Sequence, residues 1–157
     1  MADISLLTMF DEVRSATLNA LSGVDEQTAR WHPPKLSNSI LWHAGHVYSV
    51  VEWITMQSLG KTPESPEGWF AMFGWDSHPA EVPPEKWPPL ETVVQLLQSQ
   101  HVRLRSLLSA LTESQLSEPS AEWPERTVRE MILHAFQDEA SHKGEVWLLR
   151  KLQNAAR

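Results

Sequence analysis

The chain has 157 residues, of which 41% are hydrophobic and 21% are charged, a composition typical of globular proteins. The absence of cysteine excludes disulfides and Cys-ligated metal sites, and a formal net charge of −7 argues against a nucleic-acid binder. The acidic start MADISLLTMFDEV lacks the basic region of a signal peptide, and no run of about 18 apolar residues suggests a membrane span. We therefore expect one cytoplasmic domain over residues 1–157.

Four segments carry apolar residues at every third or fourth position, the spacing that places them on one face of an α-helix. These segments are residues 4–21, 38–59, 90–111 and 127–153. The second can begin at Asn38 or Ser39, and the fourth begins at Thr127, which forms a capping box with Glu130. A short helical turn is also expected over 25–30. Four helices with two long connections predict an all-α four-helix bundle with long crossover connections.

The two long connections are expected to be irregular. Residues 61–89 are so rich in proline that no regular helix or strand is predicted there. The same segment carries aromatic residues, which favour packing over disorder: Trp69, Phe70, Phe73, Trp75 and Trp87. We interpret them first as a cover over the core, and second as a wall beside a functional site. The other irregular connection is 112–126.

The last helix interrupts its own apolar stripe in the stretch HAFQDEASHKGE, where polar residues fall near the inner face. Burying such groups without partners costs roughly a few kcal/mol each, so water, one another or a metal ion must satisfy them. His134 and His142 lie roughly 12 Å apart along the axis, so one ion would be held by His134 with Asp138 or by Asp138 with His142. The second pair has the stronger surroundings, because Glu139 and Glu145 can orient an imidazole. Asp138 could instead be a simple ion-pair partner of His142.

The second helix supplies matching residues in SILWHAGHVYSVVEW, where His43 and His46 lie near the inner side. Gly45 beside them lowers helix propensity, which indicates close packing at that point. Metal sites in bundle cores are built from polar ligands on the inner sides of two or more helices. Either histidine can complete a site with the pair on the fourth helix.

The motifs NSILWHAGHVYSVVEW and LHAFQDEASHKGEVWLLRKL resemble those of the DinB-like superfamily of bacterial four-helix bundles, also described as metal-dependent hydrolases. The resemblance covers roughly residues 3–152. It implies one histidine ligand on the second helix and two ligands on the fourth, which here are His46, Asp138 and His142. Many members have histidine at the first of these fourth-helix positions, and a carboxylate occurs there in the mycothiol-dependent maleylpyruvate isomerase branch. His43 is the main competitor of His46, and His134 is expected to be a polar neighbour.

Two histidines and one carboxylate suit Zn, Ni, Fe or Mn, and affinity order alone does not choose among them. We expect Zn or Ni first, and Fe or Mn after them, as the divalent metal ion. Three protein ligands leave positions open for catalysis. We therefore expect an enzyme acting on a small molecule, either a hydrolase or an S-transferase that uses a low-molecular-weight thiol. The resemblance implies such a thiol, mycothiol or bacillithiol, which must be a cosubstrate because the chain has no cysteine. It also implies a homodimer. The alternatives are a non-catalytic metal-binding or stress-related bundle, and an interaction module with an empty polar core.

Other polar and aromatic residues carry weaker predictions. His101, with Arg103 and Arg105, is expected on a solvated face, the alternative being that the three hold an anionic substrate. Glu52 is expected to be an exposed acid. Trp42 is expected to be a core residue first and a pocket residue second.

Overall fold

The long helices of the structure begin where the sequence predicts them. The computed structural model describes residues 2–156. Its four long helices are α1 (Ile4–Leu21), α3 (Ile40–Ser58), α5 (Leu90–Ser109) and α7 (Val128–Ala156). The expected all-α fold class is confirmed, and α7 runs past its expected end at Gln153.

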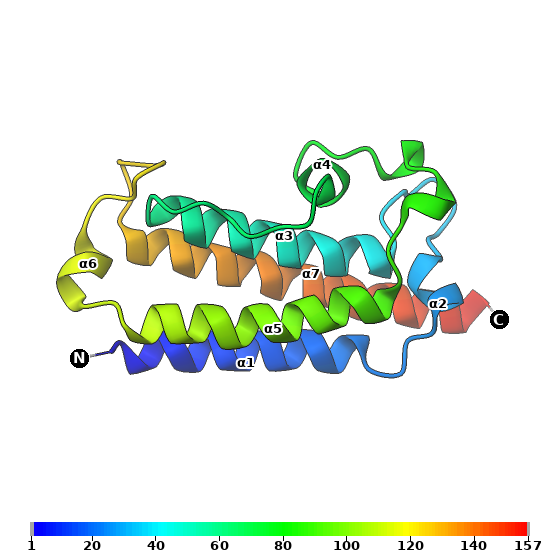
Figure 1. Ribbon diagram of the computed structural model, residues 1–157. Helices are drawn as coiled ribbons and strands as arrows, with labels where there is room; N and C mark the ends of the chain where they lie inside the picture. Colours follow the sequence, from blue (N-terminus) through cyan, green and yellow to red (C-terminus); the bar gives the residue numbers. More distant parts are fainter. Residues whose placement is uncertain (1, 157) are drawn as a thin grey trace.

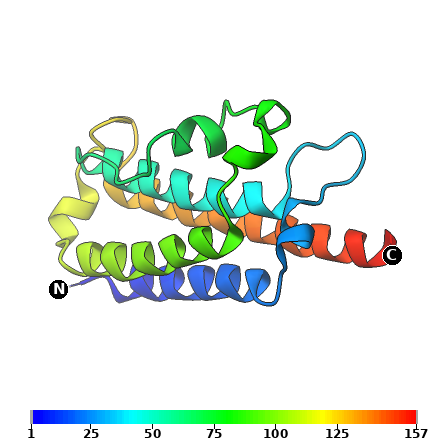
Figure 2. The same ribbon diagram turned by 45° about the vertical axis from the view of Figure 1, so that its right-hand side comes forward.

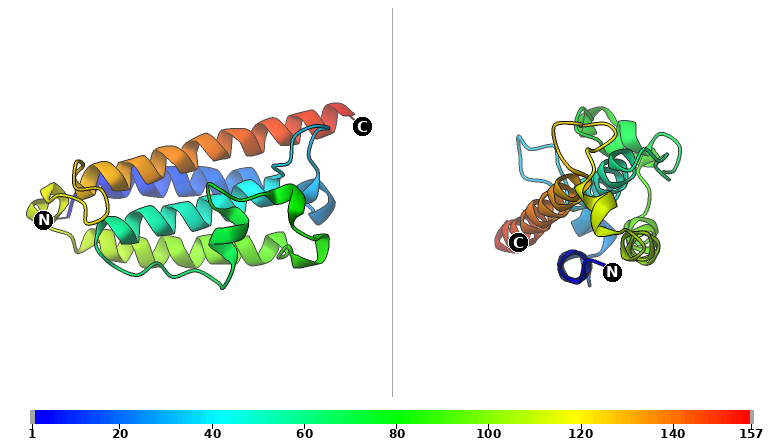
Figure 3. Two further views of the ribbon diagram at one scale, coloured as in Figure 1. Left: turned by 90° about the horizontal axis from the view of Figure 1, so that it is seen from above. Right: turned by 90° about the vertical axis from the view of Figure 1, so that its left-hand side faces the viewer.

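Each long helix packs against two of the others. α7 lies between α1 and α3, and α5 lies between the same two helices on the other side of the bundle (Figure 3). α1 and α7 run in one direction, whereas α3 and α5 run in the opposite direction (Figure 1). The chain between α3 and α5 therefore returns along the bundle, which is the predicted crossover. The C-terminal turns of α7 project beyond the other helices (Figure 2).

The apolar core fills the space between these four helices. Phe10 of α1 and Phe136 of α7 stack with their ring centroids 4.8 Å apart, and both side chains are fully buried. Leu97 and Leu104 of α5 are buried against the same centre. Within residues 2–156, no helix is long and apolar enough to cross a membrane.

Side-chain caps fix the starts of the two helices that carry the histidine motifs. Ser39 Oγ accepts a hydrogen bond from the backbone N–H of Trp42 (3.2 Å), so Ser39 is the cap of α3. At α7, the Thr127 hydroxyl accepts from the Glu130 N–H (3.2 Å), and the Glu130 carboxylate accepts from the Thr127 N–H (2.7 Å). This reciprocal pair is the predicted capping box.

The crossover contains helical structure, so the expectation of no regular helix over 61–89 was wrong. It holds α4 (Trp69–Phe73) and two 3-10 turns, η1 (Pro79–Glu81) and η2 (Pro84–Lys86). α4 occupies a proline-free stretch after Gly68, and each 3-10 turn begins with a proline, where the missing N–H costs no helical hydrogen bond. The density of proline therefore shortened the helices without preventing them.

Two further short helices lie in the remaining connections. α2 (Glu26–Arg30) is the predicted short turn after α1. α6 (Glu113–Ser117) interrupts the segment 112–126, which was predicted to be irregular. Its capping box joins Thr112 to Gln115, a pattern readable in the sequence that the prediction did not use.

Gly45 allows α4 to pack directly on α3, as the sequence suggested. A Cβ atom at Gly45 would lie 2.3 Å from Cε1 of the Phe73 ring, a distance that non-bonded carbon atoms do not adopt. Phe73 is fully buried, and Trp69 of the same helix is buried beside it. The aromatic crossover thus covers α3 at the level of its two histidines.

Candidate metal centre

Three side chains from α3 and α7 converge beneath the crossover. Nε2 of His46 lies 3.6 Å from Oδ2 of Asp138, and Nε2 of His142 lies 3.7 Å from Oδ1 of the same carboxylate. One potential ligand atom from each of the three residues lies within 4.8 Å of the others. The structure therefore brings together the three residues that the sequence named as metal ligands.

The His46 ring is held by the crossover. Its Nδ1 lies 2.6 Å from the backbone carbonyl oxygen of Phe73. A carbonyl can only accept, so Nδ1 carries the proton and donates it to this bond. In the neutral ring the lone pair is then on Nε2, the atom that faces Asp138. Ligating histidines in metalloproteins are commonly oriented by a bond of this kind.

The His142 ring is held in the same way by another histidine. Its Nδ1 lies 2.8 Å from Nδ1 of His43, so one of the two atoms donates and the other accepts. If Nδ1 of His142 is the donor, its Nε2 lone pair also faces Asp138. Both rings can thus direct a lone pair at one point without losing a hydrogen bond.

Asp138 leaves a buried oxygen without a partner in the part of the chain that the structure describes. Its Oδ2 is buried and accepts no hydrogen bond. The two His–Asp separations exceed hydrogen-bond length, so neither imidazole donates a hydrogen bond to Asp138, although both separations are within ion-pair distance. Two imidazole nitrogens and a carboxylate oxygen, all within 4.8 Å of one another, form a group that can hold a cation. The donor set fits a divalent metal ion of borderline type.

The electrostatics favour the protonation states that metal binding requires. Burial, then the neighbouring His46, lowers the pKa of His142 to about 4, even though Asp138 opposes the shift. Burial, together with His142 and His46, lowers the pKa of His43 to about 3. Burial raises the pKa of Asp138, but His46 and His142 beside it outweigh that effect and the net shift is downward. Near pH 7, His43 and His142 are therefore neutral and Asp138 is ionised.

Aromatic rings wall the site on one side, and a cavity opens on the other. The Trp42 ring stacks on His46 with centroids 4.6 Å apart, and its Nε1–H donates to Ser77 Oγ (3.0 Å). Trp42 is 6% exposed, so it is both a core residue and part of the site wall. A cavity of about 410 Å³ borders His43 and His142 on the side away from the crossover. Of the three candidate ligands, His142 is therefore the one that a small molecule in this cavity can reach directly.

The sequence profile of the DinB superfamily matches residues 9–146, which is most of the chain. The chain belongs to the DinB superfamily. A crystal structure of a conserved protein from Enterococcus faecalis has a TM-score of 0.71 with 18% sequence identity, and the match covers 97% of each chain. At that identity the likeness concerns the fold. A search among curated proteins found no match.

Three other residues that the sequence named around this DinB-superfamily site lie in three different surroundings. His134 is exposed and lines a separate shallow cavity with Arg126 and Glu130, so it does not join the three ligands. Glu145 is exposed and borders the cavity beside His142. His43 is buried against His142 and supports that ring through Nδ1.

Glu139 does not orient an imidazole, so that prediction was wrong. Its carboxylate is fully buried and forms a bidentate ion pair with Arg14 of α1, with Nε–Oε1 and Nη2–Oε2 distances of 2.8 and 3.0 Å. Arg14 also donates to the Leu97 carbonyl (2.6 Å) and to Gln100 Oε1 (2.9 Å). Sequence reasoning missed Arg14, although it falls four residues after Phe10 on the inner stripe of α1.

The remaining charged residues singled out on α3 and α5 belong to structural pairs. Glu52 is fully buried and contacts Arg103 Nη2 at 2.5 Å, so the expectation of an exposed acid was wrong. His101 Nε2 and Arg105 Nε lie 2.8 and 2.9 Å from Oδ1 of Asp11 on α1. His101, Arg103 and Arg105 of α5 thus already have carboxylate partners within the chain, and these contacts do not involve an anionic substrate.

Proposed function

We propose that this DinB-superfamily chain binds one divalent metal ion with His46, Asp138 and His142 and uses it in an enzymatic reaction on a small molecule. The observation that carries the proposal is the Asp138 carboxylate, whose Oδ2 accepts no hydrogen bond and whose two oxygens face two imidazoles with Nδ1 atoms that are already engaged. Two histidines and a carboxylate suit Zn, Ni, Fe or Mn, and we take Zn and Ni as the first candidates to test.

The open side of the site supports catalysis over a purely structural role. Structural metal sites close the coordination shell with protein ligands, whereas catalytic sites keep a position for water or substrate. Here the site has three protein ligands, and one of them, His142, borders a cavity of about 410 Å³. A bound divalent ion would supply a Lewis acid that activates water or a thiolate. Trp42 and Phe73 would exclude solvent from the opposite side, and Phe73 O and His43 would hold the two imidazoles.

Two reaction classes fit this arrangement: hydrolysis, and transfer to a low-molecular-weight thiol. The chain contains no cysteine, so a thiol nucleophile would have to enter as a cosubstrate. The alternative is a non-catalytic metal-binding bundle, which would hold the ion and turn over neither substrate type.

Elemental analysis of tag-free protein tests the metal site. Wild type is expected to retain about one divalent ion per chain, and His46→Ala, Asp138→Ala and His142→Ala are expected to lose it. His134→Ala is the matched control, because this exposed α7 histidine lies one turn from Asp138 and should leave the metal content unchanged. Wild-type protein that takes up neither Zn nor Ni would refute the proposal.

Turnover then separates the enzyme from the metal-binding alternative. The metal-loaded protein is assayed with activated esters, and with electrophiles in the presence of small thiols. Activity that disappears on chelation and returns with metal supports catalysis. A stoichiometric metal with neither activity supports the non-catalytic bundle.

A further inference from the structure

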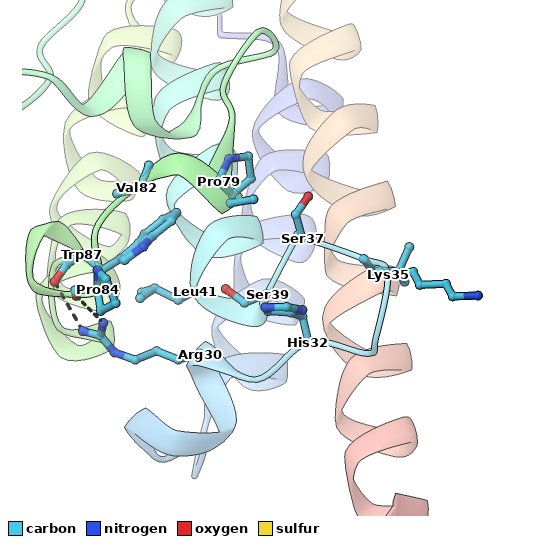
Figure 4. Close-up of a pocket in the computed structure, with 12 residues that line it drawn as sticks. Arg30, His32, Lys35, Ser37, Ser39, Leu41, Pro79, Val82, Pro84 and Trp87 are labelled. Carbon is cyan, nitrogen blue, oxygen red and sulfur yellow. Dashed lines mark hydrogen bonds between the residues drawn. The ribbon is translucent and has the colours of Figure 1, made fainter.

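A second cavity, of about 550 Å³, lies next to the metal centre between the residues that lead into α3 and the end of the crossover. Figure 4 shows it between the segment 30–41 and the segment 79–87. It contains none of the three candidate metal ligands. The residues that line it can therefore contact a part of a substrate other than the part at the metal centre.

The charge of this lining is opposite to that of the chain. Arg30, His32 and Lys35 border the cavity, and among the described residues that line it there is no Asp or Glu. The whole chain, by contrast, carries a formal net charge of −7. The hydroxyl groups of Ser37 and Ser39 add further polar atoms on the same side. This combination suits an oxyanion such as a carboxylate or a phosphate.

The opposite walls are apolar. Leu41 of α3 faces Val82 and Trp87 of the crossover across the cavity (Figure 4). An indole ring and two branched aliphatic side chains favour an apolar or aromatic group, as small-molecule sites generally do. The lining therefore fits a ligand with an apolar body and an anionic end.

Arg30 holds the two sides of the cavity together. Its Nη1 donates to the Pro84 carbonyl (3.0 Å), its Nη2 donates to the Trp87 carbonyl (3.3 Å), and its Nε donates to Glu26 (3.3 Å). Its guanidinium is turned toward the crossover backbone in Figure 4. Arg30 thus fixes the shape of the cavity, and His32 and Lys35 are the basic residues left to meet a ligand. The exposed Lys35 side chain points away from Leu41 and Trp87 in Figure 4, so its flexible stem must turn for the ammonium group to reach a ligand in the cavity.

This cavity adjoins the one at the metal centre. Lys35, Leu36 and Ser37 line both, so the segment that they form is the boundary between the two spaces. Lys35 has a φ of 73°, the left-handed region that a residue other than glycine rarely adopts. Backbone held in such a conformation is concentrated at ligand-binding sites. A molecule that passes over this segment would occupy both cavities.

We propose that the second cavity binds the anionic end of the substrate or cosubstrate, a small organic oxyanion with an apolar body. The inference rests on the proposed function only in placing the reacting group of that molecule at the metal centre. His32 and Lys35 recognise the charge, and Leu41, Val82 and Trp87 contact the apolar body.

Calorimetric titration of the full chain tests this assignment. The probes are phenylacetate, phenyl phosphate and neutral 2-phenylethanol, added to zinc-loaded and to metal-free protein. At least one anion is expected to bind in both forms, about fivefold or more tighter than the alcohol. The tighter of the two anions identifies the carboxylate or the phosphate class. His32→Gln/Lys35→Gln is expected to weaken anion binding about fivefold, and Lys86→Gln, in η2 but outside the lining, is expected to leave it unchanged.

Three results would overturn the assignment. They are equal binding of anion and alcohol, equal anion binding by the double variant and wild type, and no anion binding to metal-free protein up to about 10 mM. The last result would mean that the anion contacts only the metal. Zinc content measured on the same samples keeps the two proposals apart, because failure to load zinc refutes the metal site while the metal-free titration still decides the anion site.

Discussion

Nδ1 of His43 lies 2.8 Å from Nδ1 of His142, so one proton is shared between a candidate metal ligand and a buried histidine that is not in the ligand group. When His142 Nε2 binds a metal ion, its Nδ1 must carry the proton and His43 must accept it. Partners of this kind fix the orientation and tautomer of ligating histidines, and their removal typically costs about 10-fold to 100-fold in metal affinity.

We therefore predict that His43→Ala lowers the affinity for zinc by about 10-fold to 100-fold. The measurement is competition for zinc against a chromophoric chelator. His43→Asn retains a side-chain acceptor and should recover part of the loss. Circular dichroism shows whether each variant is folded. An affinity equal to that of wild type in His43→Ala would remove His43 from the role we assign to it.

The convergence of His46, Asp138 and His142 could be predicted because helix periodicity determines which residues share a face. Two inner stripes, each with polar residues, are enough to name two candidate pairs on α7, both containing Asp138, and two candidates on α3. That the three bind metal remains a prediction. The sequence could not choose between His43 and His46 without the family resemblance, because both lie near the inner side of α3.

The long-range contacts that hold the site residues in place could not be predicted from periodicity. The bond from His46 to the Phe73 carbonyl depends on where the crossover lies on α3, and periodicity carries no information on that position. Arg14 and Glu139 are 125 residues apart in sequence. Each falls on an inner stripe, but nothing local identifies one as the partner of the other. Glu139 was therefore assigned to the histidines, which are its neighbours in sequence.

Gly45→Ala should destabilise the protein by about 1 to 3 kcal/mol, because the new Cβ would lie 2.3 Å from the Phe73 ring. The same change in an unobstructed helix normally stabilises by about 1 kcal/mol. Gly144→Ala on α7 is the matched control, since a Cβ atom at that position would meet nothing within 4 Å. Urea denaturation should therefore give opposite signs for the two variants. Stabilisation by Gly45→Ala would show that α4 moves away from α3 easily.

Arg14→Met should lower the free energy of unfolding by about 3 to 5 kcal/mol, because it leaves the fully buried carboxylate of Glu139 without its cation. The double variant Arg14→Met/Glu139→Met should lose less, since it removes both buried charges. Chemical denaturation of the wild type, both single variants and the double variant completes the cycle. If the loss of unfolding free energy in the double variant equals the sum of the losses in the two single variants, the two residues do not interact energetically.

The metal-free protein should lose stability as the pH is lowered from about 6.5 to about 4. The pKa values of His43 and His142 are about 3 and about 4, below the ordinary value of 6.5, chiefly because both rings are buried. In the unfolded chain the same rings take up protons near pH 6.5, so across this window the unfolded state binds more protons and is favoured. Urea denaturation at several pH values measures how steeply the free energy of unfolding changes with pH. His43→Leu should reduce this slope, and added zinc should move the loss to lower pH because the metal binds only deprotonated ligands. A slope that neither change alters would mean that these histidines titrate normally in the folded protein.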